Sequence, residues 1–164
     1  VEGFKALMAL SNGEIQPRLD LMFRIARGLA LFLEMDDDDV EIIEEASFLC
    51  ELGLIGNPSD TMSCHAVASA EILEKSGLFD DLIPILRHHQ ERFDGTGDPD
   101  GLKGDQIPLF SRLLAVAERF SELSDGGMSG REDVLASLQA ERGSVLDPEL
   151  VDALIELYRI QQLS

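Results

Sequence analysis

Apolar residues recur at alternating steps of three and four along most of the chain, which is the spacing of one buried face of an α-helix. The first such stretch covers residues 14–35, and a second follows the acidic run Asp36–Asp39, whose carboxylates favour a helix N-terminus. Further helices are expected to begin at or near His65, Pro84, Pro108, Arg131 and Pro148. The pattern therefore predicts one all-α domain over residues 1–164, a bundle of about six or seven helices without convincing strands.

The same spacing identifies the side chains that should face the core of this bundle. In the first helix the expected inner positions include Leu19, Met22, Ala26, Leu29 and Leu33. In the later helices they include Ile43, Ile72, Leu73, Ile85, Leu86, Leu109, Leu113, Val116, Phe120, Val151, Leu154 and Tyr158. A chain of 164 residues with 45% apolar content can bury a sizeable core around these positions.

Charge and composition narrow the function classes. The formal net charge is −19, with 32 acidic against 13 basic residues, which argues against nucleic acids and anionic membrane surfaces as partners. No apolar run is long enough for a membrane span, and no signal-peptide pattern is present. Two cysteines do not form a disulfide framework, so we expect a reducing cytoplasm. Because the first residue is Val1 and not Met, we interpret the chain as part of a longer protein.

Residues 86–104 differ from the rest of the chain. His88 and His89 end an apolar-periodic helix, and a loop rich in Gly, Asp and Pro follows at once. Two imidazoles at a helix end can direct neutral nitrogens at one metal ion or phosphate, while glycines let the backbone approach closely. The alternative is a helix terminus followed by a solvated surface turn. Taken alone, these residues leave both interpretations open.

The longer string changes this balance. From His88 it reads His-His-x-Glu-Arg-Phe-Asp-Gly-Thr-Gly-x-Pro-Asp-Gly-Leu, which closely resembles the signature of the HD-GYP family. The resemblance covers residues 14–158 and implies a helical HD-type phosphohydrolase fold, typically with metal-dependent hydrolysis of cyclic di-GMP. It also implies a loop that faces substrate or partner, formed here by Asp94, Gly95, Gly97, Asp98, Pro99 and Lys103.

The resemblance further implies a set of metal ligands. Transferred position by position, it assigns Glu14, Glu51, His65, His88, His89 and Glu118. Two more positions, where the family has histidine, hold Arg18 and Cys50, and Cys50 is either a thiolate ligand or a buried, inert thiol. Imidazole and carboxylate groups suit Fe, Mn and Zn. The retained residues are enough for one such ion, and the sequence leaves open that none is bound.

Several positions depart from the family pattern in a way that weakens phosphate chemistry. The lysine of the His-Asp-Ile-Gly-Lys motif is replaced by Leu54, and the tyrosine of the Gly-Tyr-Pro loop by Asp98. The family's Arg-Pro-Tyr-Arg stretch is replaced by residues 124–128, which contain no arginine. These changes break the core of the family's catalytic motif, so we assign no catalytic residue. We also hypothesise that Arg18 supplies a fixed positive charge among Glu14, Glu51 and Glu118, in place of a lost cation.

Three functions are compatible with these residues. The first is a degenerate HD-GYP-like signalling domain, inactive as a cyclic di-GMP phosphodiesterase, that acts on other signalling proteins and follows a sensory or receiver domain. The second is a residual metal-dependent phosphohydrolase that uses the remaining His and Glu cluster. The third is a helical interaction module whose histidines are only structural. The lost phosphate-handling residues favour the first, and the retained histidines favour the second.

Overall fold

The computed structural model describes residues 16–53, 65–126 and 130–163. Within these ranges the chain forms seven α-helices and no strands, which confirms the predicted all-α class. The helices are α2 (Gln16–Phe32), α3 (Asp37–Leu49), α5 (His65–Ser76), α6 (Ile83–His88), α7 (Leu109–Asp125), α8 (Arg131–Glu141) and α9 (Pro148–Leu163). Short 3-10 turns connect some of them: η1 (Cys50–Leu52), η2 (Asp80–Leu82) and η3 (Gly104–Gln106).

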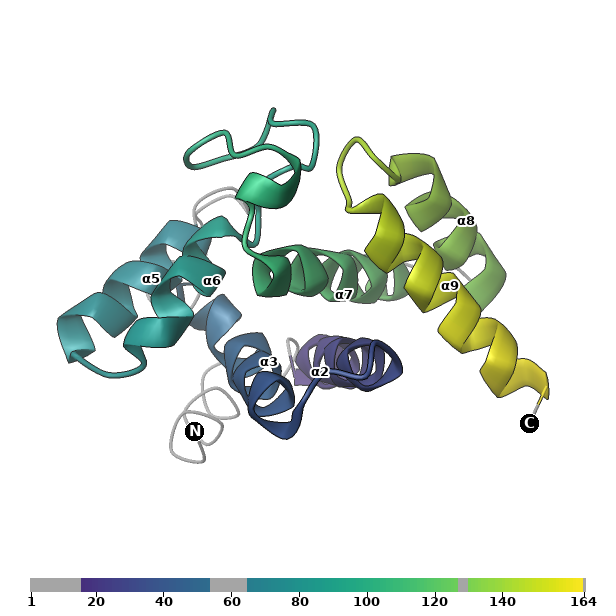
Figure 1. The fold of residues 1–164 in the computed structure, drawn as a ribbon, viewed down its shortest axis with the longest axis horizontal. Coiled ribbons are helices and arrows are strands. Elements are labelled where there is room, and N and C mark those ends of the chain that lie inside the picture. The colour runs from purple at the N-terminus through teal and green to yellow at the C-terminus, as the bar shows by residue number, and fades with distance from the viewer. Residues whose placement is uncertain (1–15, 54–64, 127–129, 164) are drawn as a thin grey trace.

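Helix α7 lies at the centre of the bundle (Figure 1). Helices α5 and α6 lie toward one end of the view and α8 and α9 toward the other, while α2 and α3 lie alongside α7. The most extensive helix contacts join α2 to α7 and α2 to α3. The loop between α6 and α7 projects from the bundle on the side away from α2 and α3. This arrangement brings together residues that are far apart in the sequence.

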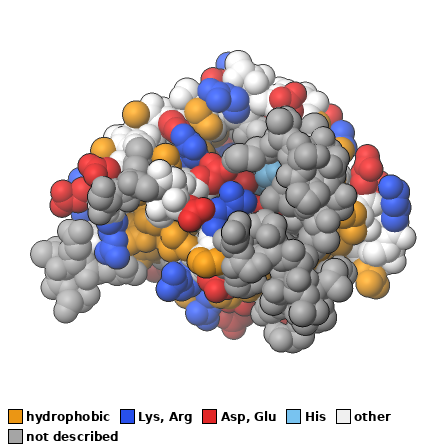
Figure 2. Space-filling model, turned by 180° about the vertical axis from the view of Figure 1, so that it is seen from behind, with side chains coloured by type: hydrophobic (Ala, Val, Ile, Leu, Met, Phe, Trp, Pro, Cys, Tyr) orange, Lys and Arg blue, Asp and Glu red, His pale blue; other side chains and the backbone are white. Residues whose placement is uncertain are grey.

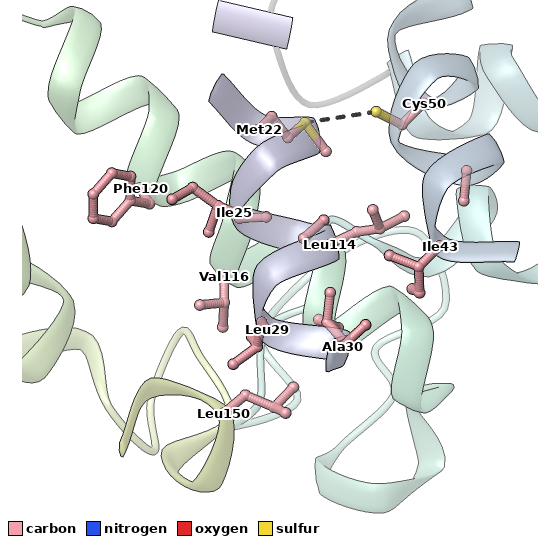
Figure 3. Packing of buried hydrophobic residues seen from close by; sticks show 14 of the residues in the cluster. Met22, Ile25, Leu29, Ala30, Ile43, Cys50, Leu114, Val116, Phe120 and Leu150 are labelled. Carbon is pink, nitrogen blue, oxygen red and sulfur yellow. Dashed lines mark hydrogen bonds between the residues drawn. The ribbon is translucent and has the colours of Figure 1, made fainter. Parts of the chain in front are cut away.

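The hydrophobic core fixes α2 against its neighbours (Figure 3). Met22 and Leu29 of α2 pack with Ile43 of α3 and with Leu114 and Phe120 of α7, and all five are almost completely buried. Full burial of a side chain of this size stabilises the fold by about 1.5–3 kcal/mol relative to exposure. The core therefore holds the N-terminal part of α2 in a defined position beside the middle of α7.

Three of the side chains predicted for the core are instead exposed. Leu33 is 37% exposed because α2 ends at Phe32 and the backbone turns away through Glu34, whose φ is 56°. Leu109 is 44% exposed because it is the first residue of α7 and precedes the inner face of that helix. Ile72 is 40% exposed because successive helical residues point about 100° apart, and the core takes Leu73. The prediction was wrong at these positions.

Local chemistry sets the helix ends that matter for the site. The acidic run begins α3 as expected, because the Asp36 carboxylate accepts a hydrogen bond of 2.9 Å from the Asp39 amide. Helix α6 begins at Ile83, with Pro84 in its first turn, and ends at His88. This short helix leaves His89 at its C-terminal end, where the chain enters the glycine-rich loop.

Candidate metal centre

Three buried side chains from separate elements converge on one point. His65 begins α5, His89 follows α6, and Glu118 lies in the middle of α7. The Nε2 atoms of His65 and His89 are 3.1 Å apart. The Glu118 carboxylate lies 3.4 Å from His65 Nε2 through Oε1 and 3.5 Å from His89 Nε2 through Oε2. No single segment of the sequence contains this cluster.

The donor spacing fits a bound transition-metal ion. Nitrogen and carboxylate ligands lie about 2.0–2.2 Å from zinc, so two donors of a tetrahedral site are about 3.3–3.6 Å apart. The three separations in the cluster, 3.1, 3.4 and 3.5 Å, are close to this range. Glu118 Oε1 is buried and has no hydrogen bond of normal geometry among the described residues. His65, His89 and Glu118 can therefore hold one ion of the type that prefers imidazole and carboxylate.

Neighbouring groups keep His89 in a form that can bind a cation. Its Nδ1 atom lies 2.6 Å from the carbonyl oxygen of Leu86, which can only accept, so Nδ1 carries the proton and Nε2 is left as an acceptor. Burial lowers the pKa of His89 and His65 lowers it further, against the opposing effect of Glu118, so this imidazole gives up its proton more readily than an exposed histidine. Burial alone would raise the pKa of Glu118, but His89 and His65 outweigh it and hold that pKa below its usual value.

Arg18 and Glu51 form a second charged group beside the cluster. Arg18 Nη2 of α2 donates a hydrogen bond of 2.7 Å to Oε1 of Glu51, which lies in η1 and is fully buried. The other carboxylate oxygen of Glu51 has no hydrogen-bond partner among the described residues. Burial and the negative charge of Glu118 raise the pKa of Glu51, whereas Arg18 and His65 lower it. Arg18 thus lies where it offsets the negative charge of two buried carboxylates.

The turn that carries Glu51 is tied closely to α5. The Ser69 hydroxyl donates to the Cys50 carbonyl at 2.6 Å and accepts from the Gly53 amide at 2.9 Å. A Cβ at Gly53 would lie 2.5 Å from the His65 carbonyl oxygen, so only glycine permits this approach. This contact sets the position of Glu51 relative to His65.

The loop after His89 is held by a buried carboxylate. Glu91 is 4% exposed and accepts hydrogen bonds from the amides of Asp100, at 2.7 Å, and Leu102, at 3.2 Å. The start of the loop is joined to the α8–α9 connection by the Phe93 and Asp94 amides, which donate to the carbonyls of residues 145 and 144. The loop therefore has a fixed position next to the cluster, on a cleft of about 300 Å³ that His89 and Glu118 also line.

Comparison with known proteins places this geometry in a family. The family model for the HD domain matches residues 3–150 of this chain. The chain belongs to the HD domain family. Its HD domain is similar to the cyclic di-GMP phosphodiesterase response regulator RpfG of Xanthomonas campestris, at 35% identity over 88% of this chain and 43% of the relative. It is also 28% identical to a 3'3'-cGAMP-specific phosphodiesterase of Vibrio cholerae, over 78% of this chain and 28% of the relative. The chain spans less than half the length of these relatives.

Solved structures show the same fold. A cyclic GMP-AMP specific phosphodiesterase of Vibrio cholerae superimposes with a TM-score of 0.74 and 16% identity, over 87% of this chain and 44% of that one. An HDG"Y"P protein of Bdellovibrio bacteriovorus gives a TM-score of 0.75 and 17% identity, over 95% and 56% of the two chains. These comparisons confirm the resemblance to HD-GYP proteins and the HD-type bundle. Among the described helices, none combines the length and the apolar character that a membrane crossing requires.

The HD domain gathers only some of the residues assigned as ligands. His65, His89 and Glu118 meet, and Glu51 lies close enough for its charge and that of Glu118 to interact. His88 is elsewhere: its Nδ1 lies 2.8 Å from the Pro84 carbonyl and its Nε2 2.9 Å from the Asp100 carboxylate. Glu14 and Leu54 lie outside the described residues. The ligand role of His88 stays a prediction that this geometry does not support.

Cys50 lies in the core, as the second of its two predicted roles requires. The thiol is fully buried, and burial together with Glu51 raises its pKa well above the usual value, which favours the neutral thiol over the thiolate that would bind a metal. Its sulfur lies 3.9 Å from the sulfur of Met22 and 3.4 Å from the Ser47 carbonyl, inside the hydrophobic core (Figure 3). Within the part of the chain that the structure describes, Cys50 is not in the metal cluster.

Of the predicted loop residues, two border the cleft. Gly97 and Asp98 line it, whereas Asp94, Gly95, Pro99 and Lys103 are not among its lining residues. Asp94 instead forms a local turn, in which its Oδ1 accepts from the amide and the hydroxyl of Thr96. The loop is therefore mainly a structural element that presents Gly97 and Asp98 to the cleft.

Sequence reasoning missed residues that also shape the cleft. Glu122 follows Glu118 by one helical turn, and burial and the charge of Glu118 raise its pKa. Gln90 lies 3.0 Å from Nδ1 of His65 through its amide nitrogen and so fixes that ring. The spacing of four between the two glutamates was a usable signal, because such residues share a helix face. On the face opposite that of Figure 1, acidic, basic and histidine side chains gather near the middle (Figure 2).

We expect Gly97→Ala to destabilise the domain by at least about 2 kcal/mol, because the added methyl group would overlap backbone atoms, which cannot move away as a flexible side chain can. A Cβ at this position would lie 2.2 Å from the Arg92 amide nitrogen and 2.8 Å from backbone atoms of Glu91. Gly28→Ala is the matched control: its Cβ would meet only Leu157, at 3.6 Å, within α2. Chemical denaturation should show Gly28→Ala unchanged or more stable. Equal stability of the two variants would contradict the close approach.

Proposed function

We propose that this chain is a degenerate HD-GYP-like signalling domain that is catalytically inactive as a cyclic di-GMP phosphodiesterase. It acts through contacts with other signalling proteins or domains in the cytoplasm. Residues 1–164 form the HD part of a longer protein, in which a sensory or receiver domain precedes it. The similarity to a response regulator, of which the chain covers 43%, supports this arrangement.

The observation that carries the proposal is the hydrogen bond between Arg18 and Glu51. Glu51 occupies the position that the family resemblance assigns to a metal ligand, yet its Oε1 is bound at 2.7 Å by a guanidinium. An arginine is always protonated and cannot ligate a metal. To bind this oxygen, a metal ion would have to displace the Arg18 guanidinium. The two positive charges would then lie next to each other. Arg18 thus takes the place of a second positive ion.

One ion is what the remaining donors support. His65, His89 and Glu118 would hold it, and when bound such an ion supplies Lewis acidity and a water molecule of lowered pKa. Two-metal hydrolysis asks for a second complete set of ligands. Among the described residues, no other group of three or more His, Cys, Asp and Glu side chains could hold a metal. The single ion in our proposal stabilises the fold and organises the cleft.

The charges around the cleft also oppose a cyclic dinucleotide. Four carboxylates line it, from Glu91, Asp98, Glu118 and Glu122, against two guanidinium groups. One of the latter, Arg119, is already bound to Glu141 at 2.6 Å. A phosphodiester carries negative charge and would meet a net negative surface. This balance favours loss of the ancestral substrate.

The geometry of the metal cluster favours a second candidate function. The donor atoms of His65, His89 and Glu118 have a spacing suited to a metal ion. We would not expect this spacing in a domain that binds no metal. The alternative is therefore a residual metal-dependent phosphohydrolase that uses these residues with His88 and Glu51, on another phosphoester.

Metal content and hydrolysis together distinguish these functions. The domain is purified without chelator, with Fe, Mn and Zn supplied, and incubated with cyclic di-GMP; the Thermotoga maritima cyclic di-GMP phosphodiesterase, a relative at 28% identity, serves as the active control. We expect about one metal ion per chain or fewer and no product above the blank. About two ions per chain with product formation would overturn the proposal. About one ion with cleavage of a generic phosphoester would favour the alternative.

A further inference from the structure

The arginines of this acidic chain are almost all paired with carboxylates. The chain has ten arginines, all within the described residues. Eight have a carboxylate oxygen near a side-chain nitrogen, at most 3.8 Å away: Arg18, Arg27, Arg87, Arg92, Arg112, Arg119, Arg142 and Arg159. Arg24 and Arg131 have no ion pair or hydrogen bond with any described residue, although the net charge is −19.

Both unpaired arginines line the same surface groove. Arg24 of α2 and Arg131 of α8 border a hollow of about 270 Å³, together with Tyr158 and the apolar side chains of Leu21 and Leu157. A second hollow of about 260 Å³ adjoins it and shares Leu21, Arg131 and Tyr158. Among the residues that the structure describes, no carboxylate lines either hollow, and neither hollow shares a lining residue with the cleft beside the metal cluster. We call the two hollows the arginine groove.

Tyr158 lines both hollows and adds a third hydrogen-bond donor to the groove. The hydroxyl of Tyr158 makes no hydrogen bond to the described residues, and Arg131 lies over the Tyr158 ring at 4.7 Å. Burial raises the pKa of Tyr158, and the charges of Arg131 and Arg24, which line the same hollow, oppose that shift. The Tyr158 ring also stacks with Phe120, with ring centroids 5.4 Å apart. Two guanidinium groups and a phenol, none of them hydrogen-bonded to an acceptor among the described residues, thus line one groove.

We propose that the arginine groove binds a small organic anion, a phosphate or carboxylate that carries an apolar group. The anionic head is held by Arg24, Arg131 and the Tyr158 hydroxyl, because guanidinium and phenol donate to oxyanions and arginine matches their planar or forked geometry. The apolar part lies on Leu21 and Leu157. The groove thus offers an anion two unpaired guanidinium groups on a chain whose net charge is −19. The site is independent of the metal cluster and of the function proposed for it.

Tyr158 makes the groove directly observable, because the chain contains one tyrosine and no tryptophan. Tyrosine fluorescence of the whole chain therefore reports on this groove alone. The probes are n-butyl phosphate, hexanoate, inorganic phosphate and n-butanol, none of which absorbs at the excitation wavelength. We expect a saturable fluorescence change with n-butyl phosphate or hexanoate below about 20 mM, weaker binding of inorganic phosphate, and none of butanol. The tighter of the two organic anions identifies the head group.

Matched variants separate site binding from collisional quenching. Arg24→Gln with Arg131→Gln should weaken binding of the organic anion by about tenfold or more, because two charge-assisted donors are lost. The control, Arg27→Gln with Arg159→Gln, removes the same charge from α2 and α9 at exposed, paired arginines and should leave affinity within about twofold. A linear, non-saturable change, equal loss in both double variants, or equal affinity for inorganic and butyl phosphate would overturn the proposal.

Discussion

Replacing Arg18 with Met is expected to lower the free energy of unfolding by about 3 kcal/mol in metal-free protein, the lower end for breaking a buried ion pair. The Glu51 carboxylate is fully buried and the Arg18 side chain is 18% exposed, so neither end is well solvated. Without the guanidinium, Glu51 would lose its hydrogen bond to Arg18 at Oε1, and its Oε2 already has no partner in the part of the chain that the structure describes. Two buried carboxylates would then share the site without a fixed cation. Urea denaturation with a chelator present measures the effect.

A second pair on the same helix gives the control. Arg27 and Glu44 join α2 to α3 with an equally short contact of 2.6 Å, but their side chains are 51% and 31% exposed. Arg27→Met should therefore cost less than about 1 kcal/mol. In addition, Glu51→Gln should recover much of the loss in the Arg18→Met background, since it removes the unpaired charge. A cost of a few tenths of a kcal/mol for Arg18→Met would show that Arg18 is an ordinary surface residue.

Replacing His89 with Gln is expected to weaken binding of Zn, Mn or Fe by at least about 100-fold, since losing an outer partner of a ligand alone costs 10–100-fold. His89 supplies one of three donor atoms, and its Nε2 is oriented by the bond between Nδ1 and the Leu86 carbonyl. A glutamine fills a similar volume but offers a weak neutral oxygen in place of the imidazole nitrogen. Competition with a fluorescent chelator measures the affinity, and circular dichroism checks that the variant is folded.

His88 provides a control that differs by one position. It has the same side chain but hydrogen bonds to Pro84 and Asp100 instead of the cluster. His88→Gln should leave metal affinity within about threefold, because no donor of the cluster changes. If both variants lost affinity alike, His88 would be a ligand as the family resemblance implies, and the side chain would have to turn from Asp100 toward the cluster. If neither lost affinity, the cluster would not be the metal site.

The local sequence determined much of what the structure contains. Periodicity of three and four fixed the helices and most of the core, because an amphipathic face has one stable orientation toward other apolar faces. The acidic run starts α3, and the histidine pair ends α6. Position-by-position resemblance to the family also assigned His65, His89 and Glu118 as metal ligands. Periodicity failed where exposure depends on a helix end, as at Leu33 and Leu109.

The tertiary structure alone decided which charged residues meet. The one-residue step from His88 to His89 separates a surface hydrogen bond from the buried cluster, because successive residues at a helix end point in different directions. The family resemblance placed Arg18 among Glu14, Glu51 and Glu118, but its hydrogen bond to Glu51, 33 residues away, depends on how α2 packs against α3 and α7. Likewise, α2, α7, α8 and α9 together form the arginine groove. Such contacts arise from the packing of separate helices, and the spacing within any one helix contains no information about them.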